Sequence, residues 1–118
     1  MAYEVEFTDE FGEWWYGLTA EEQDSVTSIV GLLEDLGPHL GSPHSSGIYG
    51  SRHHHMRELR IQHAGRPYRV LYAFDPRRMA ILLIGGDKTG DDRWYSRMIP
   101  FADTLYDQHL REIRFDKE

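Results

Sequence analysis

Cysteine is absent from the sequence, which excludes a disulfide framework and a thiolate metal site. A long apolar run is absent as well: the longest, at residues 79–84, is far too short to cross a bilayer. The acidic start MAYEVEFTDE lacks the apolar stretch of a secretory signal. The 118 residues, 40% hydrophobic and 13% aromatic, have the composition of a folded domain. We expect one domain over residues 1–118, located in the cytoplasm and without a membrane partner.

The common catalytic signatures are also missing. The sequence holds no G-x-S-x-G, no H-E-x-x-H and no dinucleotide fingerprint. The stretch GGDKTG at 85–90 fails the phosphate-loop pattern, because Asp87 precedes Lys88 and no helix is expected directly after it. We therefore exclude nucleoside triphosphate binding. Lys88 still follows an apolar strand, a place where functional side chains often lie.

Charge is distributed unevenly along this acidic chain, whose formal net charge is −7. Residues 51–78, the basic segment, carry seven arginines and four histidines but only two acids, Glu58 and Asp75, which leaves a charge of +5. The other residues together carry −12. Such a cluster indicates a localised anionic partner. The negative total argues against non-specific nucleic-acid binding, because the summed field repels phosphate at long range.

Hydrophobic periodicity predicts the secondary structure. Alternation over 3–8 is typical of a strand, and the apolar stripe at 11, 14, 15 and 18 has helical spacing. The sequence Thr19-Ala-Glu-Glu22 is a capping box, so a second helix is expected from there to Gly37-Pro38. Residues 38–52, rich in Gly, Ser, Pro and His, are expected to form one long loop.

Three strands are expected in the second half, over 56–62, 68–74 and 79–84, and short turns should join them into an antiparallel meander. The third is apolar on both faces, which predicts a central position. A last helix is expected over 94–114, with Pro100 as a point where it could break. The order β-α-α-β-β-β-α predicts an α+β fold with a mostly antiparallel sheet.

Strand alternation separates the candidate arginines. Arg57 should share a face with Leu59 and Ile61, whereas Arg60 should lie opposite, with Glu58. Arginine within an apolar strand is costly to desolvate unless it is paired. One interpretation is an ion pair of Glu58 with Arg60 or Arg69; the other is a phosphate clamp, since the guanidinium fork matches phosphate oxygens. The pattern leaves both open.

The triplet His53-His54-His55 suggests a metal site, because histidine is the commonest metal ligand. Consecutive residues at the entrance of a strand point alternately to opposite sides, however, and no acid lies at a useful spacing nearby. We therefore expect no metal and no cofactor. A solvated loop histidine, or a proton carrier near phosphate, fits the triplet better.

Five stretches resemble one protein family. They are MRELRI (56–61), YRVLYAFDPRR (68–78), LLIGGDK (82–88), WY (94–95) and IPFADTLY (99–106). They are similar to the phage-derived HigB-like toxins, which belong to the RelE superfamily of type II toxin–antitoxin modules. The resemblance implies a compact microbial-ribonuclease-like fold and a toxin that cleaves mRNA, usually on the ribosome. It also implies a helix-turn-helix antitoxin as the partner.

The resemblance also implies roles for individual residues. Arg69 matches the family's arginine that holds the scissile phosphate, and Arg57 and Arg60 match the basic pair on the preceding strand. Lys88 lies where the family has a basic residue after the last strand. Tyr95 lies where some members carry an aromatic acid–base residue. We accordingly expect Arg60, Arg69, Lys88 and Tyr95 to act in catalysis.

The substrate-binding set is expected to contain Arg57, His53, His55 and Arg66, all from the basic segment. The implied reaction needs no metal: the RNA 2′-hydroxyl attacks the adjacent phosphorus and leaves a 2′,3′-cyclic phosphate, so DNA should not be cut. Typical RelE-like toxins are strongly basic, and this acidic chain departs from them. The alternative is a non-catalytic RNA- or protein-binding module of the same fold, acting as a co-repressor with its antitoxin.

Overall fold

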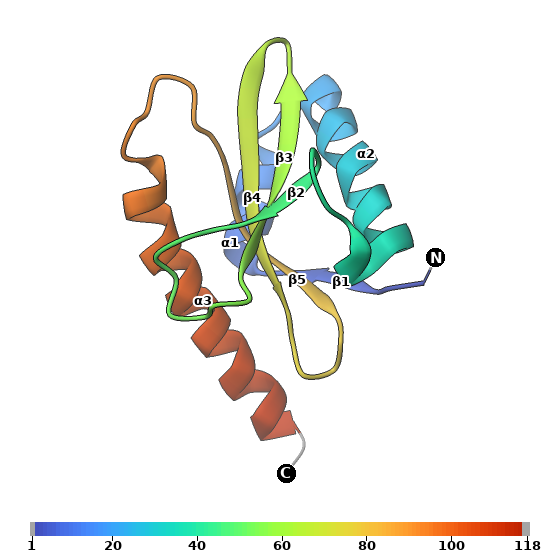
Figure 1. Cartoon of the computed structure of the whole chain (residues 1–118), viewed down its shortest axis with the longest axis vertical. Helices are drawn as coiled ribbons and strands as arrows, with labels where there is room; N and C mark the ends of the chain where they lie inside the picture. The colour runs from blue at the N-terminus through green and yellow to red at the C-terminus, as the bar shows by residue number, and fades with distance from the viewer. Residues whose placement is uncertain (1, 117–118) are drawn as a thin grey trace.

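The computed structural model describes residues 2–116, which form a single five-stranded sheet between helices (Figure 1). The strand order is β1-β5-β4-β3-β2, with β1 parallel to β5 and the other neighbours antiparallel. The predicted α+β class with a mostly antiparallel sheet is confirmed. The strands are β1 (Val5–Phe7), β2 (Ser45–Gly47), β3 (Arg57–His63), β4 (Arg66–Phe74) and β5 (Ala80–Asp87). The helices are α1 (Asp9–Tyr16), α2 (Ala20–Leu36), the short 3-10 helix η1 (Gly37–His39) and α3 (Trp94–Asp116).

The helix ends follow from local chemistry. Oγ1 of Thr8 accepts a hydrogen bond from the Phe11 amide at 3.0 Å and so caps α1. The predicted capping box starts α2: the Thr19 amide donates to Glu22 at 2.8 Å and the Glu22 amide donates to Oγ1 of Thr19 at 3.1 Å. At the end of α2, Gly37 has a φ of +54°, a conformation that favours glycine.

The last helix continues through Pro100, so the possible break there does not occur. Proline removes one backbone donor, but the buried side chains of Ile99, Ala102 and Leu105 hold the helix against the sheet. Within residues 2–116, no helix combines the length and the apolar character that a membrane span requires.

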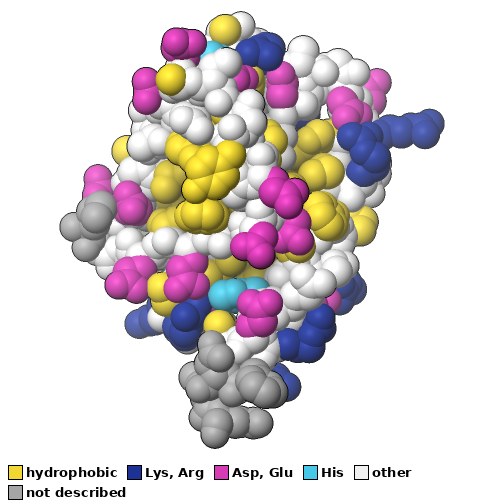
Figure 2. Space-filling view, turned by 180° about the vertical axis from the view of Figure 1, so that it is seen from behind, with side chains coloured by type: hydrophobic (Ala, Val, Ile, Leu, Met, Phe, Trp, Pro, Cys, Tyr) yellow, Lys and Arg dark blue, Asp and Glu magenta, His cyan; other side chains and the backbone are white. Residues whose placement is uncertain are grey.

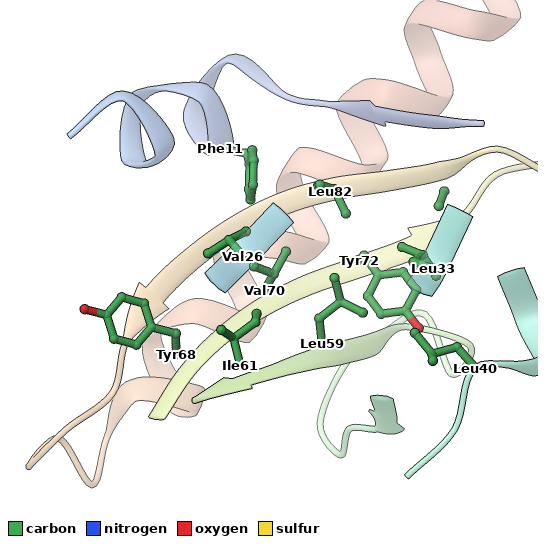
Figure 3. Close-up of a cluster of buried hydrophobic side chains, with 11 residues drawn as sticks. Phe11, Val26, Leu33, Leu40, Leu59, Ile61, Tyr68, Val70, Tyr72 and Leu82 are labelled. Atoms are coloured by element: carbon green, nitrogen blue, oxygen red, sulfur yellow. The ribbon is translucent and has the colours of Figure 1, made fainter. Parts of the chain in front are cut away.

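Two apolar cores lie on opposite faces of the sheet. Leu59 and Ile61 of β3 and Val70 of β4 point to the face that α1 and α2 cover (Figure 3). Met56, Leu71 and Ala73 point to the other face, where they meet α3. Strand β5 is buried on both faces between β1 and β4, which confirms its predicted central position.

The expected long loop at 38–52 is partly ordered, which corrects the prediction. It contains η1 and also β2, which pairs antiparallel with β3 and forms the second edge of the sheet. The sequence Ser-Ser-Gly has no apolar alternation that would indicate a strand. Backbone pairing and the bond of 2.6 Å between Ser45 Oγ and Tyr72 Oη hold this segment instead.

Candidate active site

A buried carboxylate, Glu58 of β3, joins three elements on the α3 face of the sheet. Its Oε2 accepts a hydrogen bond from Ser46 Oγ at 2.8 Å, and its Oε1 accepts one from Tyr95 Oη at 2.5 Å. The Nε of Arg69 lies 3.6 Å from the same Oε1. We call Ser46, Glu58, Arg69 and Tyr95 the Glu58 cluster. Since Glu58 and Arg69 are 7% and 6% exposed, the two charges depend on each other for compensation.

The guanidinium of Arg69 is incompletely bonded. Its Nη1 donates to the backbone carbonyl of Tyr68 at 3.0 Å. Its buried Nε has no hydrogen-bond partner within residues 2–116. A buried donor without an acceptor costs free energy. This arginine therefore keeps capacity for an additional oxygen ligand, and phosphate oxygens match its geometry.

Arg60 lies directly beside Arg69 across the sheet, because the two residues are register partners in β3 and β4. Like charges in opposite positions repel each other. The Arg60 side chain is exposed and forms no ion pair with any residue of the described part, whereas Arg69 has Glu58. The site thus presents one buried, paired cation next to one exposed cation.

Lys88, directly after β5, lies beside Tyr95, the member of the Glu58 cluster at the start of α3. Burial, followed by the hydrogen bond to Glu58, raises the pKa of Tyr95, and the Arg69 guanidinium offsets only part of this rise. Tyr95 is therefore protonated at neutral pH and can donate a proton. The Nζ of Lys88 lies 5.6 Å from the centroid of the Tyr95 ring, within cation–π range.

Gly86 of β5 leaves space for the Trp94 side chain beside the Glu58 cluster. It is the register partner of Arg69 in β5, and a Cβ atom at this position would lie 2.5 Å from Nε1 of Trp94. The absence of a side chain lets Trp94, which opens α3, pack directly on the sheet. This contact positions the neighbouring Tyr95 beside Glu58 and Arg69.

Two of the expected substrate-binding residues lie on the other face. Arg57 donates from Nε to Ser45 Oγ at 3.1 Å, on the side of the α1–α2 core. Arg66 lies at the hairpin between β3 and β4, where it pairs with Glu22 at 3.5 Å and Asp87 at 3.2 Å. The structure therefore does not bring Arg57 and Arg66 together with Arg69.

The two expected histidines lie beside α3, in the turn before β3. Nε2 of His53 is 2.8 Å from Asp107 Oδ1, and the ring of His55 packs against Tyr106. Burial, and then the neighbouring His53, lower the pKa of His55, so its ring is neutral at pH 7. The imidazoles of His53 and His55 approach to 6.0 Å between centroids because this turn is not yet a strand. Within residues 2–116, no three histidine or acidic side chains are placed to hold a metal ion.

Three of the seven arginines of the basic segment, Arg52, Arg66 and Arg77, pair with acids from elsewhere in the chain. Nη2 of Arg52 pairs with Asp107 at 2.7 Å, and Nη2 of Arg77 pairs with Glu6 at 2.8 Å. Arg77 also binds the buried Asp75; burial raises the pKa of Asp75, but hydrogen bonds from His109 and Arg77 outweigh it and lower the pKa overall. The exposed Arg60 is thus a cation whose charge stays available to a ligand.

Sequence reasoning did not assign Glu58 and Ser46 to the site. Glu58 was expected only as an ion-pair partner, and the pair with Arg69 is one of the two alternatives left open above. Its additional bonds to Ser46 and Tyr95 depend on β2 and on the start of α3. Strand alternation allows Glu58 and Arg69 to lie on the same face of the sheet. This is the sequence signal from which the contribution of Glu58 to the site could be found.

The family model "Phage derived protein Gp49-like (DUF891)" matches residues 13–107. This chain belongs to that Gp49-like family. The matched region contains the complete Glu58 cluster together with Arg60 and Lys88. The expected similarity to the phage-derived, HigB-like family is confirmed.

Curated relatives of this Gp49-like chain come from Mycobacterium tuberculosis. It is 48% identical over 91 residues to the putative toxin HigB3, an alignment that covers 76% of this chain and 78% of HigB3. It is 41% identical over 106 residues to the putative toxin HigB2, covering 88% of this chain. The chain spans about half of HigB2, 53% of its length.

Solved structures show the same fold for the Gp49-like chain at low sequence identity. A mutant of the Escherichia coli toxin RelE in the free state superposes with a TM-score of 0.60 at 14% identity, covering 81% of this chain and 93% of RelE. The archaeal RelE–RelB complex from Pyrococcus horikoshii gives a TM-score of 0.56 at 15% identity, covering 76% and 99%. These similarities establish a RelE-like fold.

Proposed function

We propose that this protein is the toxin of a type II toxin–antitoxin module and acts as a metal-independent mRNA endoribonuclease in the cytoplasm. The observation that carries the proposal is the Glu58 cluster beside Arg60: a buried, under-bonded guanidinium, an exposed cation and a protonated tyrosine on one face. The HigB3, HigB2 and RelE relatives support the toxin class.

In the proposed reaction, the 2′-hydroxyl of RNA gives up its proton to water and attacks the adjacent phosphorus. A 2′,3′-cyclic phosphate forms, and the bond to the 5′-oxygen breaks. Arg60 and Arg69 stabilise the negative charge that develops on the phosphoryl oxygens. Tyr95 donates a proton to the leaving 5′-oxygen, and Lys88 adds positive charge beside it. Glu58 acts as a positioning residue, because it binds Arg69 and Tyr95 at the same time.

Cleavage of naked and ribosome-bound mRNA by purified protein tests this function. Arg60→Ala is the most informative variant, because Arg60 is exposed and forms no ion pair in the described part, so the fold should remain intact. We expect a loss of roughly 100-fold or more in cleavage rate, by analogy with the removal of one oxyanion-stabilising donor. Arg111→Ala, which removes an equal charge from an exposed position on α3, is the matched control.

The buried arginine requires a second comparison. Arg69→Ala leaves Glu58 without its counter-charge, so lost activity must be separated from unfolding. Arg69→Lys keeps the charge but not the planar fork. If Arg69→Lys folds normally and cuts RNA at the wild-type rate, the planar fork of Arg69 is not required for cleavage.

The proposed partners are a helix-turn-helix antitoxin and translated mRNA. Two of the structural relatives are complexes of RelE with RelB, from Escherichia coli and Pyrococcus horikoshii, which supports an antitoxin partner. Because the net charge is −7, encounter with free RNA should be slow, and cleavage of ribosome-bound message should be much faster. Rapid cleavage of naked RNA would contradict this dependence on the ribosome.

A non-catalytic co-repressor is the second candidate. The ion pair between Glu58 and Arg69 and the acidic total charge favour it, since both reduce affinity for phosphate. A folded protein that binds its antitoxin but cuts neither naked nor ribosome-bound mRNA would support this candidate instead.

A further inference from the structure

Strand β1 leaves one edge of the sheet open. The backbone bonds between the β1 segment and β5 include Ala80 N to Glu4 O at 3.0 Å and Thr8 N to Leu82 O at 3.1 Å. Since backbone groups alternate in direction along a strand, Val5 and Phe7 direct their N–H and C=O groups away from β5. No strand within residues 2–116 lies on that side. Such an edge is a template for another strand.

A cavity flanks this edge on each face of the sheet. On the α1–α2 face, a mostly apolar cavity of about 320 Å³ is bordered by Phe7, Phe11 and Trp15. On the α3 face, a polar cavity of about 390 Å³ is bordered by four acids, including Glu10 and Glu112, and by Arg77, which pairs with Glu6. Because side chains of an added strand alternate between faces, one set would enter the apolar cavity and the other would meet the acids.

The charge of this surface is one-sided. The first 51 residues contain ten Asp and Glu residues and no Lys or Arg, and they include all of β1, α1 and α2. Figure 2 views the molecule from behind and shows hydrophobic side chains gathered on this face, with acidic side chains beside them and Lys and Arg side chains toward the edges of the view. Phe7 at the strand end is 56% exposed. An apolar patch with a rim of one charge is typical of an interaction site.

We propose that the β1 edge binds an extended, basic segment of a partner protein. The segment adds as a sixth strand through the outward backbone groups of Val5 and Phe7. Its apolar side chains fill the cavity on the α1–α2 face, and its Lys and Arg side chains pair with the acids that border the two cavities. This edge is opposite β2 and Ser46, so the site is separate from the Glu58 cluster and goes beyond the proposed RNA cleavage.

A seven-residue peptide that alternates Lys and Val is the probe, and the full chain is the receptor. We expect binding that weakens as salt rises, together with slower hydrogen exchange at the Val5 and Phe7 amides. A peptide that alternates Glu and Val should not bind. Failure of the Lys–Val peptide to bind, or binding that leaves both amides exchanging at their free rates, would overturn the proposal.

Two neighbouring residues of α2 give a matched pair of variants. Glu34 borders the apolar cavity, whereas Asp35 is exposed and does not border it. Glu34→Lys and Asp35→Lys change the net charge equally. We expect the first to weaken peptide binding by roughly tenfold and the second by about twofold or less, since close charges matter more than the screened total. Equal losses of peptide affinity in the two variants would show that net charge alone drives binding and would overturn the proposal that the peptide binds at this edge.

Val5→Pro tests the strand pairing itself. The Val5 N–H points outward, so proline removes it without breaking a bond to β5, as edge strands tolerate. We expect peptide binding to be lost while circular dichroism stays unchanged; unchanged binding would overturn strand addition. If Val5→Pro unfolds the chain, the comparison of Glu34→Lys with Asp35→Lys decides whether the peptide binds at this edge. None of these residues contacts Arg69, so RNA cleavage remains a separate measurement for the proposed function.

Discussion

Replacement of Glu58 by glutamine is the sharpest test of how the arginine site is held together. The variant removes the only carboxylate that contacts Arg69 within residues 2–116. Glutamine also has a single acceptor oxygen, so it cannot accept from both Ser46 and Tyr95 as Glu58 does. Glu58 and Arg69 are both more than nine-tenths buried, so water can replace little of the interaction that the variant removes.

The expected loss in the free energy of unfolding for Glu58→Gln follows from these contacts. Removing one partner of a buried ion pair costs about 3–5 kcal/mol. The 3.6 Å separation is long for a direct hydrogen bond, and Nη1 keeps its bond to the Tyr68 carbonyl, so we expect the lower part of this range, about 3 kcal/mol. For a chain of this size, the melting temperature should fall by on the order of 10 °C.

A double-mutant cycle with Arg69→Met isolates the electrostatic part. In urea unfolding, Glu58→Gln should cost about 3 kcal/mol with Arg69 present and clearly less in the Arg69→Met background, because the orphaned charge is then absent. A cost below about 1 kcal/mol, or the same cost in both backgrounds, would refute the view that Glu58 holds Arg69 by charge compensation.

Three further predictions concern pH, packing and metals. A hydrogen bond from Tyr68 is the main cause that lowers the pKa of Glu22 from 4.5 to about 2. Its ionised form stabilises the fold above pH 4.5, and that contribution is lost as the pH falls toward 2, so Glu22→Gln should show a smaller fall in melting temperature over this range. Gly86→Ala places a methyl group 2.5 Å from Nε1 of Trp94 and should cost about 1–3 kcal/mol in urea unfolding, whereas Gly31→Ala, with open space in α2, should not destabilise. RNA cleavage should persist in EDTA; a loss that magnesium or zinc restores would contradict the proposed mechanism.

The parts of the site that sequence could predict are those fixed by strand period. Alternation alone placed Arg57 with Leu59 and Ile61, and the structure confirms that this face meets the α1–α2 core. Alternation also placed Glu58 on the face opposite Arg57, where it meets Arg69. The two-residue period of a strand is a local property of the chain, so the face on which a residue lies can be predicted without the tertiary fold.

The parts that sequence could not predict depend on contacts between distant segments. Strand β2 has no apolar alternation, and Ser46 joins the site only because β2 pairs with β3. The pairing of Arg52 with Asp107 links two segments far apart in the sequence. Net charge per segment therefore predicted a larger positive surface than the fold presents, since ion pairs neutralise several of these arginines.

Acids predominate in the first part of this chain and arginines in the basic segment, and that distribution bears on how the molecule functions. Nine of the ten acids of the first 51 residues lie in β1, α1 and α2, whereas Arg60 and Arg69 lie on the α3 face of β3 and β4. At distances beyond about 8–10 Å at physiological salt, screening removes most of the repulsion between the acids and a bound phosphate. The acidic layer should therefore slow the approach of free RNA more than it weakens contact at Arg60. A substrate delivered by a larger assembly avoids that slow step, so raising the salt should accelerate cleavage of naked RNA relative to ribosome-bound message. The opposite salt dependence would mean that Arg60 and Arg69, and not the acidic layer, control the encounter.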